Sequence, residues 1–282
     1  MKSSIKIISR VLFKASLILI ALLAGFPLHA LAADLLLKPR GEREFLIIAH
    51  RGANKFAPEN TLPAIEKAIE LGVDFVEIDV RTTKDGKLVL MHNADVNGAT
   101  NGKGMVRDLA FGEIRKMDAG IRMGEKFRGV FVPTLEETLA AAKGRVNIYL
   151  DWKDADANAL AAALDKAGML DSTLVYGGAG ELLLLQKINP KIRPMPQVDT
   201  IEQFKMLLAS GLKFDVAAAS WPSFSKELAD AIHAAGKVVF LDILAEADSC
   251  AGFIKAMKKG ADAVQTDRPD VILKCSAPDK SK

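Results

Sequence analysis

An alternation of predicted strands and helices from residue 45 almost to the C-terminus most constrains what this chain can fold into. Each repeat has an apolar, β-branched segment, a short loop and a segment rich in Ala, Leu, Glu and Lys, which is typical of parallel α/β folds. Eight strands are predicted, near residues 45–49, 73–80, 146–152, 173–176, 192–198, 214–220, 237–243 and 261–266. Helices are predicted between them, near residues 62–71, 135–142, 157–167, 181–187, 201–210, 225–235 and 249–259.

Eight such strands in about 250 residues favour an α/β (β/α)8 barrel, the TIM barrel. A doubly wound open sheet is the alternative, but no glycine-rich dinucleotide or P-loop fingerprint follows any predicted strand. The stretch between Val80 and Pro133 breaks the alternation. We interpret it as a small insertion after the second strand, at residues 93–130. Because the active sites of this fold lie at the C-terminal ends of strands, the insertion is expected to border the site.

Residues 1–32 have the features of a secretory signal peptide. Four basic residues and no acidic one lie within residues 2–14, an apolar run extends to residue 26, and Ala30-Leu31-Ala32 offers a cleavage site. The run of about 12 apolar residues is shorter than the roughly 20 that span a bilayer. We therefore predict a signal peptide at 1–32, a barrel domain at 33–282, and export to the periplasm or out of the cell. An uncleaved N-terminal anchor is the alternative.

The charge of the predicted barrel domain excludes one class of partner. The whole chain has 38 basic and 35 acidic residues. The domain without the signal peptide has 34 basic and 35 acidic residues, which gives a net charge of −1. Nucleic-acid binding requires many cations to displace counterions from phosphates, so we expect no nucleic-acid partner. The domain also has no basic or aromatic amphipathic stretch, and we expect no stable membrane insertion after cleavage. The sequence does not define the oligomeric state.

The chain has two cysteines, Cys250 and Cys275. Neither lies in a CxxC or Cys/His neighbourhood, which argues against a zinc site or a catalytic thiol. An exported protein enters an oxidising space in which the two can pair. Two buried thiols on C-terminal helices are the alternative, and the sequence leaves both open.

Carboxylates gather at the ends of two predicted strands. Glu77 and Asp79 are two residues apart, so the period of a strand directs both to the same side. Asp151 and Lys153 end the next long strand in the same way. Oxygen ligands of this kind suit a hard divalent ion such as Mg²⁺ or Ca²⁺, and a buried ion-pair network is the alternative.

Two histidines are predicted to join these carboxylates. The first strand ends in His50-Arg51, and a turn at Asp85-Gly86 would return the chain along the second strand, with His92 across from Asp79. Histidines exchange protons near neutral pH, and cations stabilise charge on phosphate oxygens. Cleavage of a phosphodiester needs both a base for the attacking hydroxyl and an acid for the leaving alcohol. The sequence therefore indicates phosphodiester chemistry rather than a Ser/His/Asp triad.

Five segments, in this order and spacing, resemble the glycerophosphodiester phosphodiesterase family: His50-Arg51-Gly52, Pro58-Glu59-Asn60-Thr61, Glu77-Ile78-Asp79-Val80, Thr83-Lys84-Asp85-Gly86 and Leu90-Met91-His92. The resemblance continues through residues 132–137 and 261–269. It implies a (β/α)8 barrel with a small insertion, and an enzyme that hydrolyses glycerophosphodiesters to glycerol 3-phosphate and an alcohol. A phosphodiesterase acting on intact or lyso lipids and a noncatalytic phosphodiester-binding relative are the alternatives.

The resemblance also implies site residues: His50 and His92 as the acid/base pair, Arg51 and Lys153 as phosphate contacts, and Glu77, Asp79 and Asp151 as ligands of one divalent cation, Ca²⁺ or Mg²⁺. Three positions depart from the family pattern. Asp151 stands where glutamate is usual, Asn93 where aspartate follows the histidine, and the strand near 237–243 lacks the usual tryptophan-containing ending.

Four residues near these motifs are expected to have supporting roles. Asn60 or Thr61 is expected to cap the following helix. Glu59 is expected to order the loop after Arg51, and Asp267 to cap the loop after the last strand.

Overall fold

The computed structural model describes residues 36–41 and 43–275. The predicted signal peptide at 1–32 lies outside the described residues. The architecture that follows is that of the compact unit from residue 39 onward. Within the described ranges, no helix combines the length and apolarity needed to cross a bilayer.

Eight parallel strands form the barrel, in the order β6-β5-β4-β2-β1-β9-β8-β7. Their bounds are β1 (Leu46–Ala49), β2 (Phe75–Thr82), β4 (Asn147–Trp152), β5 (Thr173–Gly177), β6 (Arg193–Pro196), β7 (Val216–Ser220), β8 (Val238–Asp242) and β9 (Ala263–Thr266). The two ends of this order meet where Gln197 bridges Ala218 in parallel. The barrel is thus nearly closed, which confirms the (β/α)8 prediction over the open sheet.

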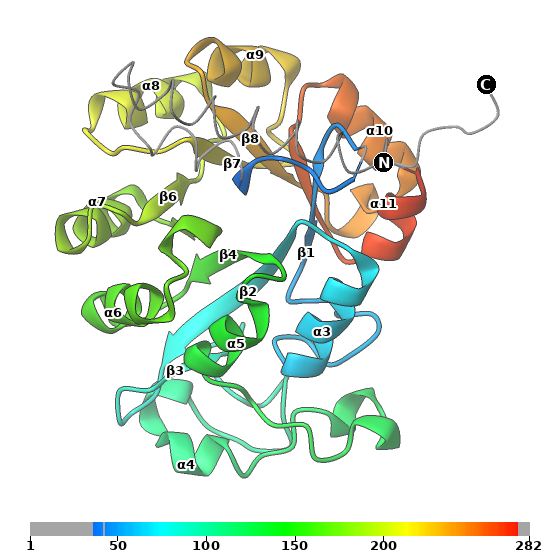
Figure 1. The fold of residues 1–282 in the computed structure, drawn as a ribbon, viewed down its shortest axis with the longest axis vertical. Coiled ribbons are helices and arrows are strands. Elements are labelled where there is room, and N and C mark those ends of the chain that lie inside the picture. Colours follow the sequence, from blue (N-terminus) through cyan, green and yellow to red (C-terminus); the bar gives the residue numbers. More distant parts are fainter. Residues whose placement is uncertain (1–35, 42, 276–282) are drawn as a thin grey trace, which may run out of the picture. The chain divides into compact units, whose positions relative to one another are not determined.

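Helices lie between the strands and surround them (Figure 1). They are α3 (Leu62–Leu71), α5 (Leu135–Ala142), α6 (Ala157–Ala167), α7 (Ala179–Ile188), α8 (Ile201–Ala209), α9 (Lys226–Ala234), α10 (Cys250–Lys258) and α11 (Pro269–Cys275). Side chains at Thr134, Asp156, Thr200, Ser225 and Ser249 accept a backbone N–H in the first turn of a helix, so five of these helices begin at a capping residue.

The side chains of strand β2 alternate between the outer face of the barrel, which packs against the helices, and the barrel interior. Val76, Ile78 and Val80 belong to the main hydrophobic core, which they share with residues of the surrounding helices. The alternate positions, Phe75, Glu77 and Asp79, face the barrel interior. Phe75 packs edge-on against Phe240 there, with ring centroids 5.4 Å apart. An aromatic layer thus closes the interior below the two carboxylates.

A short strand, β3 (Leu88–Leu90), pairs antiparallel with β2. Leu90 lies opposite Val80, and the Met91 N–H donates to the Asp79 carbonyl at 3.0 Å. The predicted pairing of position 92 with position 79 is therefore wrong by one residue. The reversal is a three-residue loop closed by Thr83 and Lys87 rather than a two-residue turn, with Gly86 at φ 78°.

Between β3 and α5 the chain forms a segment of short helices. It contains α4 (Phe111–Ile114) and 3₁₀ turns at Val106–Asp108, Ile121–Met123 and Glu125–Phe127. The segment and β3 share a small hydrophobic core, formed by Val89, Met91, Val96, Val106, Ile114, Ala119 and Val132. The segment thus packs with β3 next to the C-terminal end of β2.

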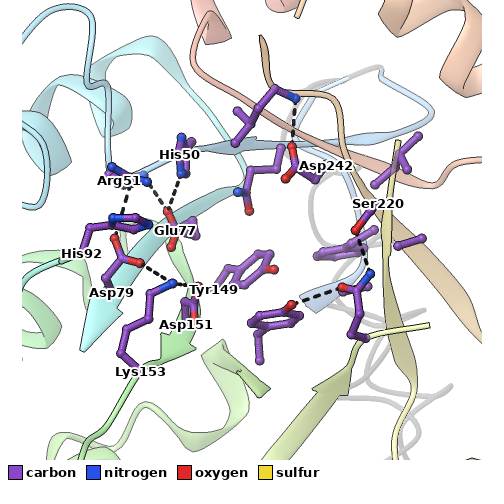
Figure 2. Close-up of a pocket in the computed structure, with 18 residues that line it drawn as sticks. His50, Arg51, Glu77, Asp79, His92, Tyr149, Asp151, Lys153, Ser220 and Asp242 are labelled. Atoms are coloured by element: carbon purple, nitrogen blue, oxygen red, sulfur yellow. Dashed lines mark hydrogen bonds and ion pairs between the residues drawn. The ribbon is translucent and has the colours of Figure 1, made fainter. Parts of the chain in front are cut away.

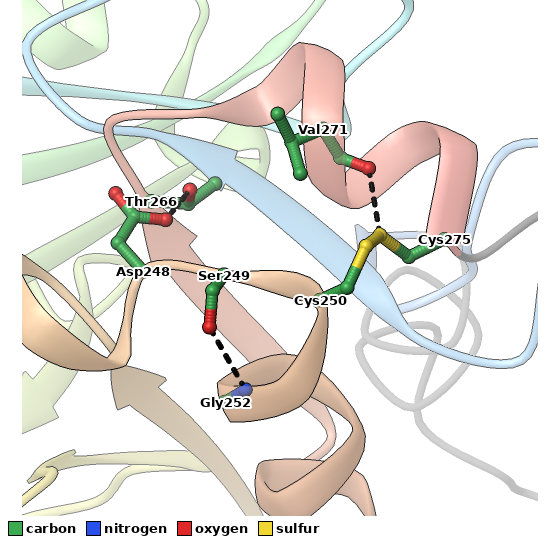
Figure 3. Close-up of a disulfide and its surroundings, with 7 residues drawn as sticks. All are labelled: Asp248, Ser249, Cys250, Gly252, Thr266, Val271 and Cys275. Atoms are coloured by element: carbon green, nitrogen blue, oxygen red, sulfur yellow. Dashed lines mark hydrogen bonds between the residues drawn. A yellow bond between two sulfur atoms is a disulfide. The ribbon is translucent and has the colours of Figure 1, made fainter.

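A disulfide joins Cys250 to Cys275, with 5.7 Å between the Cα atoms. Figure 3 shows that it ties the start of α10 to the end of α11. Of the two possibilities that the sequence left open, the structure thus has the paired cysteines.

Replacing both cysteines by serine is expected to lower the free energy of unfolding by about 3 kcal/mol, because the bond closes a loop that otherwise adds entropy to the unfolded chain. Urea unfolding of both proteins, with and without a reductant, measures this difference. Reductant is expected to destabilise the wild type alone. An equal response of both proteins would contradict a stabilising disulfide.

Candidate active site

Three carboxylates meet in the barrel interior. Glu77 and Asp79 in β2 and Asp151 in β4 each offer an oxygen, and these atoms lie within 4.8 Å of one another. Asp79 and Asp151 are register partners in the sheet. Burial, together with the charges of Asp79 and Asp151, raises the pKa of Glu77 well above its ordinary range. The cluster therefore favours a bound positive charge.

Two cationic side chains lie beside this cluster and neutralise part of its negative charge. Lys153 Nζ lies 2.5 Å from an Asp151 oxygen and 3.2 Å from an Asp79 oxygen. Arg51 Nε lies 3.5 Å from Asp79 Oδ2. Burial alone would lower the pKa of Lys153, but its hydrogen bond to Asp151 and the two carboxylate charges raise it. The three converging carboxylates outnumber these two cations, and an oxygen donor set of this kind fits a divalent cation.

Arg51 occupies a strained turn at the end of β1. Its φ is 52°, in the left-handed region, a conformation that costs about 1–3 kcal/mol and is often found at functional sites. The next residue, Gly52, has no room for a side chain, because an added Cβ would lie 2.8 Å from the Ala64 backbone. The turn aims the Arg51 N–H at Glu77 Oε2, 2.7 Å away. The buried Nε of Arg51 has no hydrogen-bond partner in the described chain, so it can donate to an anion.

The loop before α3 differs from the prediction that Asn60 or Thr61 caps the helix. Thr61 is the N-cap residue, but its side chain donates to the Pro58 carbonyl instead. Asn60, at φ 55°, donates to Asp79 Oδ2 at 2.7 Å and accepts the Asp79 N–H at 3.1 Å. Asn60 therefore fixes the orientation of a candidate metal ligand. Glu59 pairs with Arg51 at 2.9 Å and so holds the loop against it, as expected.

His50 is oriented by a residue 217 positions away. Its Nδ1 lies 2.7 Å from Asp267 Oδ1, and its Nε2 is 4.0 Å from Glu77 Oε2. Burial would raise the pKa of Asp267, but hydrogen bonds from His50, Asn54 and Lys55 lower it strongly, so this carboxylate is ionised. An ionised carboxylate can only accept, which places a proton on Nδ1, so in the neutral imidazole the lone pair is on Nε2. Asp267 thus positions His50 rather than capping a loop.

His92 follows β3 and lines the same cavity as His50. Its Nδ1 lies 2.9 Å from Asn93 Oδ1. Its carbonyl accepts two hydrogen bonds from the Arg81 guanidinium, at 3.1 and 2.8 Å. These backbone contacts therefore fix the position of His92. His92 lines the cavity as predicted, although its predicted register with β2 was wrong by one residue.

All seven predicted site residues line one cavity of about 250 Å³ (Figure 2). Sequence reasoning missed the rest of its wall, which includes Tyr149, Tyr176, Gln197, Ser220, Asp242 and Gln265. The period of two along the strands could have found Tyr149, because it precedes Asp151 by two residues.

A second hollow of about 600 Å³ shares His50 and Arg51 with the first. Residues of the segment between β3 and α5, among them Asn93 and Arg122, form part of its lining. This segment therefore borders the site, as the position of the predicted insertion implied.

Comparisons with known proteins agree on one family. Residues 50–271 match the model of the glycerophosphoryl diester phosphodiesterase family. A glycerophosphodiester phosphodiesterase of Bacillus altitudinis is 30% identical over 242 residues, which cover 81% of this chain and 96% of that protein. One from Caldanaerobacter subterraneus is 54% identical over 92 residues, but the match spans only 38% of that protein's length and 33% of this chain.

Solved structures share the fold. In the crystal structure of a glycerophosphodiester phosphodiesterase from Agrobacterium tumefaciens, the sequence is 30% identical to this one and the TM-score is 0.73. The match covers 81% of this chain and 99% of the crystallised chain. A phosphodiesterase from Oleispira antarctica, whose structure was solved in complex with sn-glycerol-3-phosphate, is 24% identical to this chain, with a TM-score of 0.71. The match covers 82% of this chain and 96% of that protein's chain.

Proposed function

Because the chain belongs to the glycerophosphoryl diester phosphodiesterase family, we propose that it hydrolyses glycerophosphodiesters to glycerol 3-phosphate and an alcohol. The observation that carries this proposal is the convergence of two histidines, two cationic side chains and three carboxylates on one cavity. This set can hold a phosphodiester by its charge and transfer protons on both sides of the phosphorus.

Arg51 and Lys153 would contact the phosphate oxygens. His50 would remove the proton of the attacking hydroxyl through Nε2, because Asp267 keeps the Nδ1 proton in place and stabilises the imidazolium that forms. His92 would then donate its proton to the departing alkoxide. In this step a bond forms from the attacking oxygen to phosphorus and the bond to the alcohol oxygen breaks, so one histidine gains the proton that the other loses. The attacking hydroxyl belongs to the substrate's glycerol or to water.

Glu77, Asp79 and Asp151 would hold one divalent cation, Ca²⁺ or Mg²⁺, which would supply positive charge beside the phosphate. The fit rests on their three converging oxygens and on the raised pKa of Glu77. Asn60 would keep Asp79 turned toward this position.

The proposal is tested by incubating the purified protein with glycerophosphocholine, glycerophosphoethanolamine and glycerophosphoglycerol and measuring released glycerol 3-phosphate. Release from at least one of them, in the presence of Mg²⁺ or Ca²⁺, is the expected result. No release from folded protein with either ion would contradict the proposal, and hydrolysis of lysophospholipids alone would favour the lipid alternative.

Replacing Asp267 by asparagine is expected to lower kcat about 10²-fold with little change in KM, because His50 loses the carboxylate that orients it. The variant should also be less stable at neutral pH. Since the pKa of Asp267 is lowered in the folded protein, its ionised form stabilises the fold above the ordinary value of 3.8, and this contribution is lost as the pH falls further. The difference in Tm between wild type and variant should therefore shrink in acid. Steady-state kinetics and melting curves at pH 7 and pH 3 measure both effects, and an unchanged kcat would refute the positioning role.

We also propose that the protein is exported. The signal-like residues 1–32 support this location, and so does the disulfide, because such bonds persist in oxidising compartments. Cell fractionation, followed by mass measurement of the recovered protein, tests both export and cleavage after Ala32.

A further inference from the structure

Asp248 is a half-buried carboxylate that lines neither hollow of the site. It follows the 3₁₀ turn Ala245–Ala247, between β8 and α10. One of its oxygens accepts the Thr266 hydroxyl, as Figure 3 shows, and the other accepts the Asp267 N–H at 2.7 Å. Asp248 therefore joins the loop after β8 to the end of β9, where Asp267 enters the site.

The two residues that Asp248 holds both bind His50. The Thr266 carbonyl accepts the His50 N–H at 3.1 Å, and the Asp267 carboxylate binds His50 Nδ1 at 2.7 Å. Thr266 is fully buried, and its Oγ1 accepts the Arg268 N–H at 2.8 Å while its hydroxyl proton is donated to Asp248. Asp248 thus anchors the stretch of backbone from which both contacts with His50 arise.

The turn that carries Asp248 is itself held in place. Gly252 in α10 packs so closely against this turn that an added Cβ would collide with the Ala247 carbonyl oxygen. The disulfide from Cys250 to Cys275 ties the start of α10 to the end of α11, the helix that follows β9 (Figure 3). The position of Asp248 relative to the end of β9 is therefore fixed from both helices.

A carboxylate in this place has an electrostatic cost. Burial raises the pKa of Asp248, hydrogen bonds from Thr266 and from the Asp267 N–H lower it, and the nearby charge of Asp267 raises it. A neutral side chain would avoid this repulsion and could still close a loop. Only a carboxylate, however, offers an acceptor oxygen to each of two donors. The choice of residue therefore fits the task of holding Thr266 and Asp267 together.

We propose that Asp248 is a positioning residue of the reaction, which keeps the Asp267 carboxylate aimed at His50 Nδ1. This inference rests on the proposed function, in which His50 acts as the base. Asp248 acts through Asp267, because it does not line the cavity that would hold the phosphate. Displacing a catalytic group by about 1 Å can cost about 10²-fold in rate, and part of this loss is expected when Asp248 is removed.

The test is a double-mutant cycle between Asp248 and Asp267. Asp248→Ala is expected to lower kcat about 10-fold with little change in KM. Asp248→Asn should recover most of this loss, because its amide oxygen can still accept the Asp267 N–H. In the Asp267→Asn background, Asp248→Ala should lower kcat by less than about a further 2-fold, because the contact through which it acts is already broken.

Asp156 provides the matched control. Its carboxylate also accepts a backbone N–H, that of Ala159 at 2.8 Å, and it lines neither hollow. Asp156→Ala should therefore keep the wild-type kcat, even where its melting temperature falls. If Asp248→Ala does not fold, Thr266→Val removes the hydroxyl that holds the carboxylate, and its loss of kcat should likewise disappear in the Asp267→Asn background.

The protonation of the His50 ring gives a readout that needs no turnover. Nitrogen NMR distinguishes the two neutral tautomers of a histidine, and the chain has four histidines, so the His50 signals can be assigned by comparison with His50→Ala. The wild type should carry the proton of the neutral ring on Nδ1, and Asp248→Ala should show a mixture of tautomers. This result in a protein that releases no glycerol 3-phosphate would refute the proposed function and leave the positioning role intact.

Three results would overturn the inference. The first is an unchanged kcat in Asp248→Ala with a lowered melting temperature, which would make Asp248 purely structural. The second is an equal loss of kcat with and without Asp267→Asn, or an Asp248→Asn variant as slow as Asp248→Ala. The third is an unchanged His50 tautomer in folded Asp248→Ala.

Discussion

Replacing His92 by alanine is expected to lower kcat by about 10²–10⁴-fold, the usual contribution of a general acid or base. The side chain lines the cavity and, among the residues that the structure describes, hydrogen-bonds only to Asn93, so its loss should leave the fold intact. His50→Ala is expected to have an effect of the same order, because each histidine would perform one of the two proton transfers. Rates of glycerol 3-phosphate release, with circular dichroism and melting curves for each variant, measure the effect.

His233 provides a matched control for these variants. It lies in α9, pairs with Asp262 at 2.8 Å and is absent from the lining of both hollows. His233→Ala should therefore keep the wild-type kcat. Near-normal turnover in His50→Ala or His92→Ala would remove that histidine from the mechanism.

Removal of divalent cations is expected to lower activity about 10³-fold or more, because a metal ion contributes several kcal/mol of charge stabilisation in reactions of this type. EDTA should abolish most of the release of glycerol 3-phosphate, and added Ca²⁺ or Mg²⁺ should restore it. Glu77→Gln should show the same loss without chelator, since it replaces one carboxylate oxygen by an amide NH₂ group and removes one charge from the cluster.

A second measurement does not depend on turnover. The ion should raise the stability of the wild type by about 2.7 kcal/mol at a concentration 100 times its Kd. The melting temperature of Glu77→Gln should respond much less. Glu136→Gln, at an exposed residue of α5, should respond like the wild type. Equal melting shifts in all three proteins would show that the ion binds elsewhere.

The fold was predictable because strands and helices alternate along the whole barrel. Along each strand, successive side chains point to opposite faces of the sheet. This alternation of side chains brought Glu77 and Asp79 to one face, and the shared C-terminal edge of parallel strands brought Asp151 to them. These inferences need only the local direction of the chain. They do not depend on side-chain detail.

The errors arose where a residue's partner is set by tertiary structure. An asparagine at position 60 can cap the helix or hydrogen-bond a neighbouring carboxylate. Only the closeness of Asp79 in the folded chain decides between these two roles. The pairing of His50 with Asp267 joins positions 217 apart, and neither neighbourhood signals it. The register of β3 depended on one additional loop residue, which the Asp85-Gly86 pair does not specify.

The pairing of β1 with β9 makes the site depend on both ends of the barrel. His50 follows the first strand and Asp267 the last, so the histidine acquires its orienting carboxylate only after the final strand has been synthesised and has closed the sheet. A nascent or C-terminally truncated chain would possess the three carboxylates without an aligned base. This order of assembly would delay hydrolysis until the complete polypeptide has folded, and turnover would then serve as a reporter of full-length, correctly closed protein.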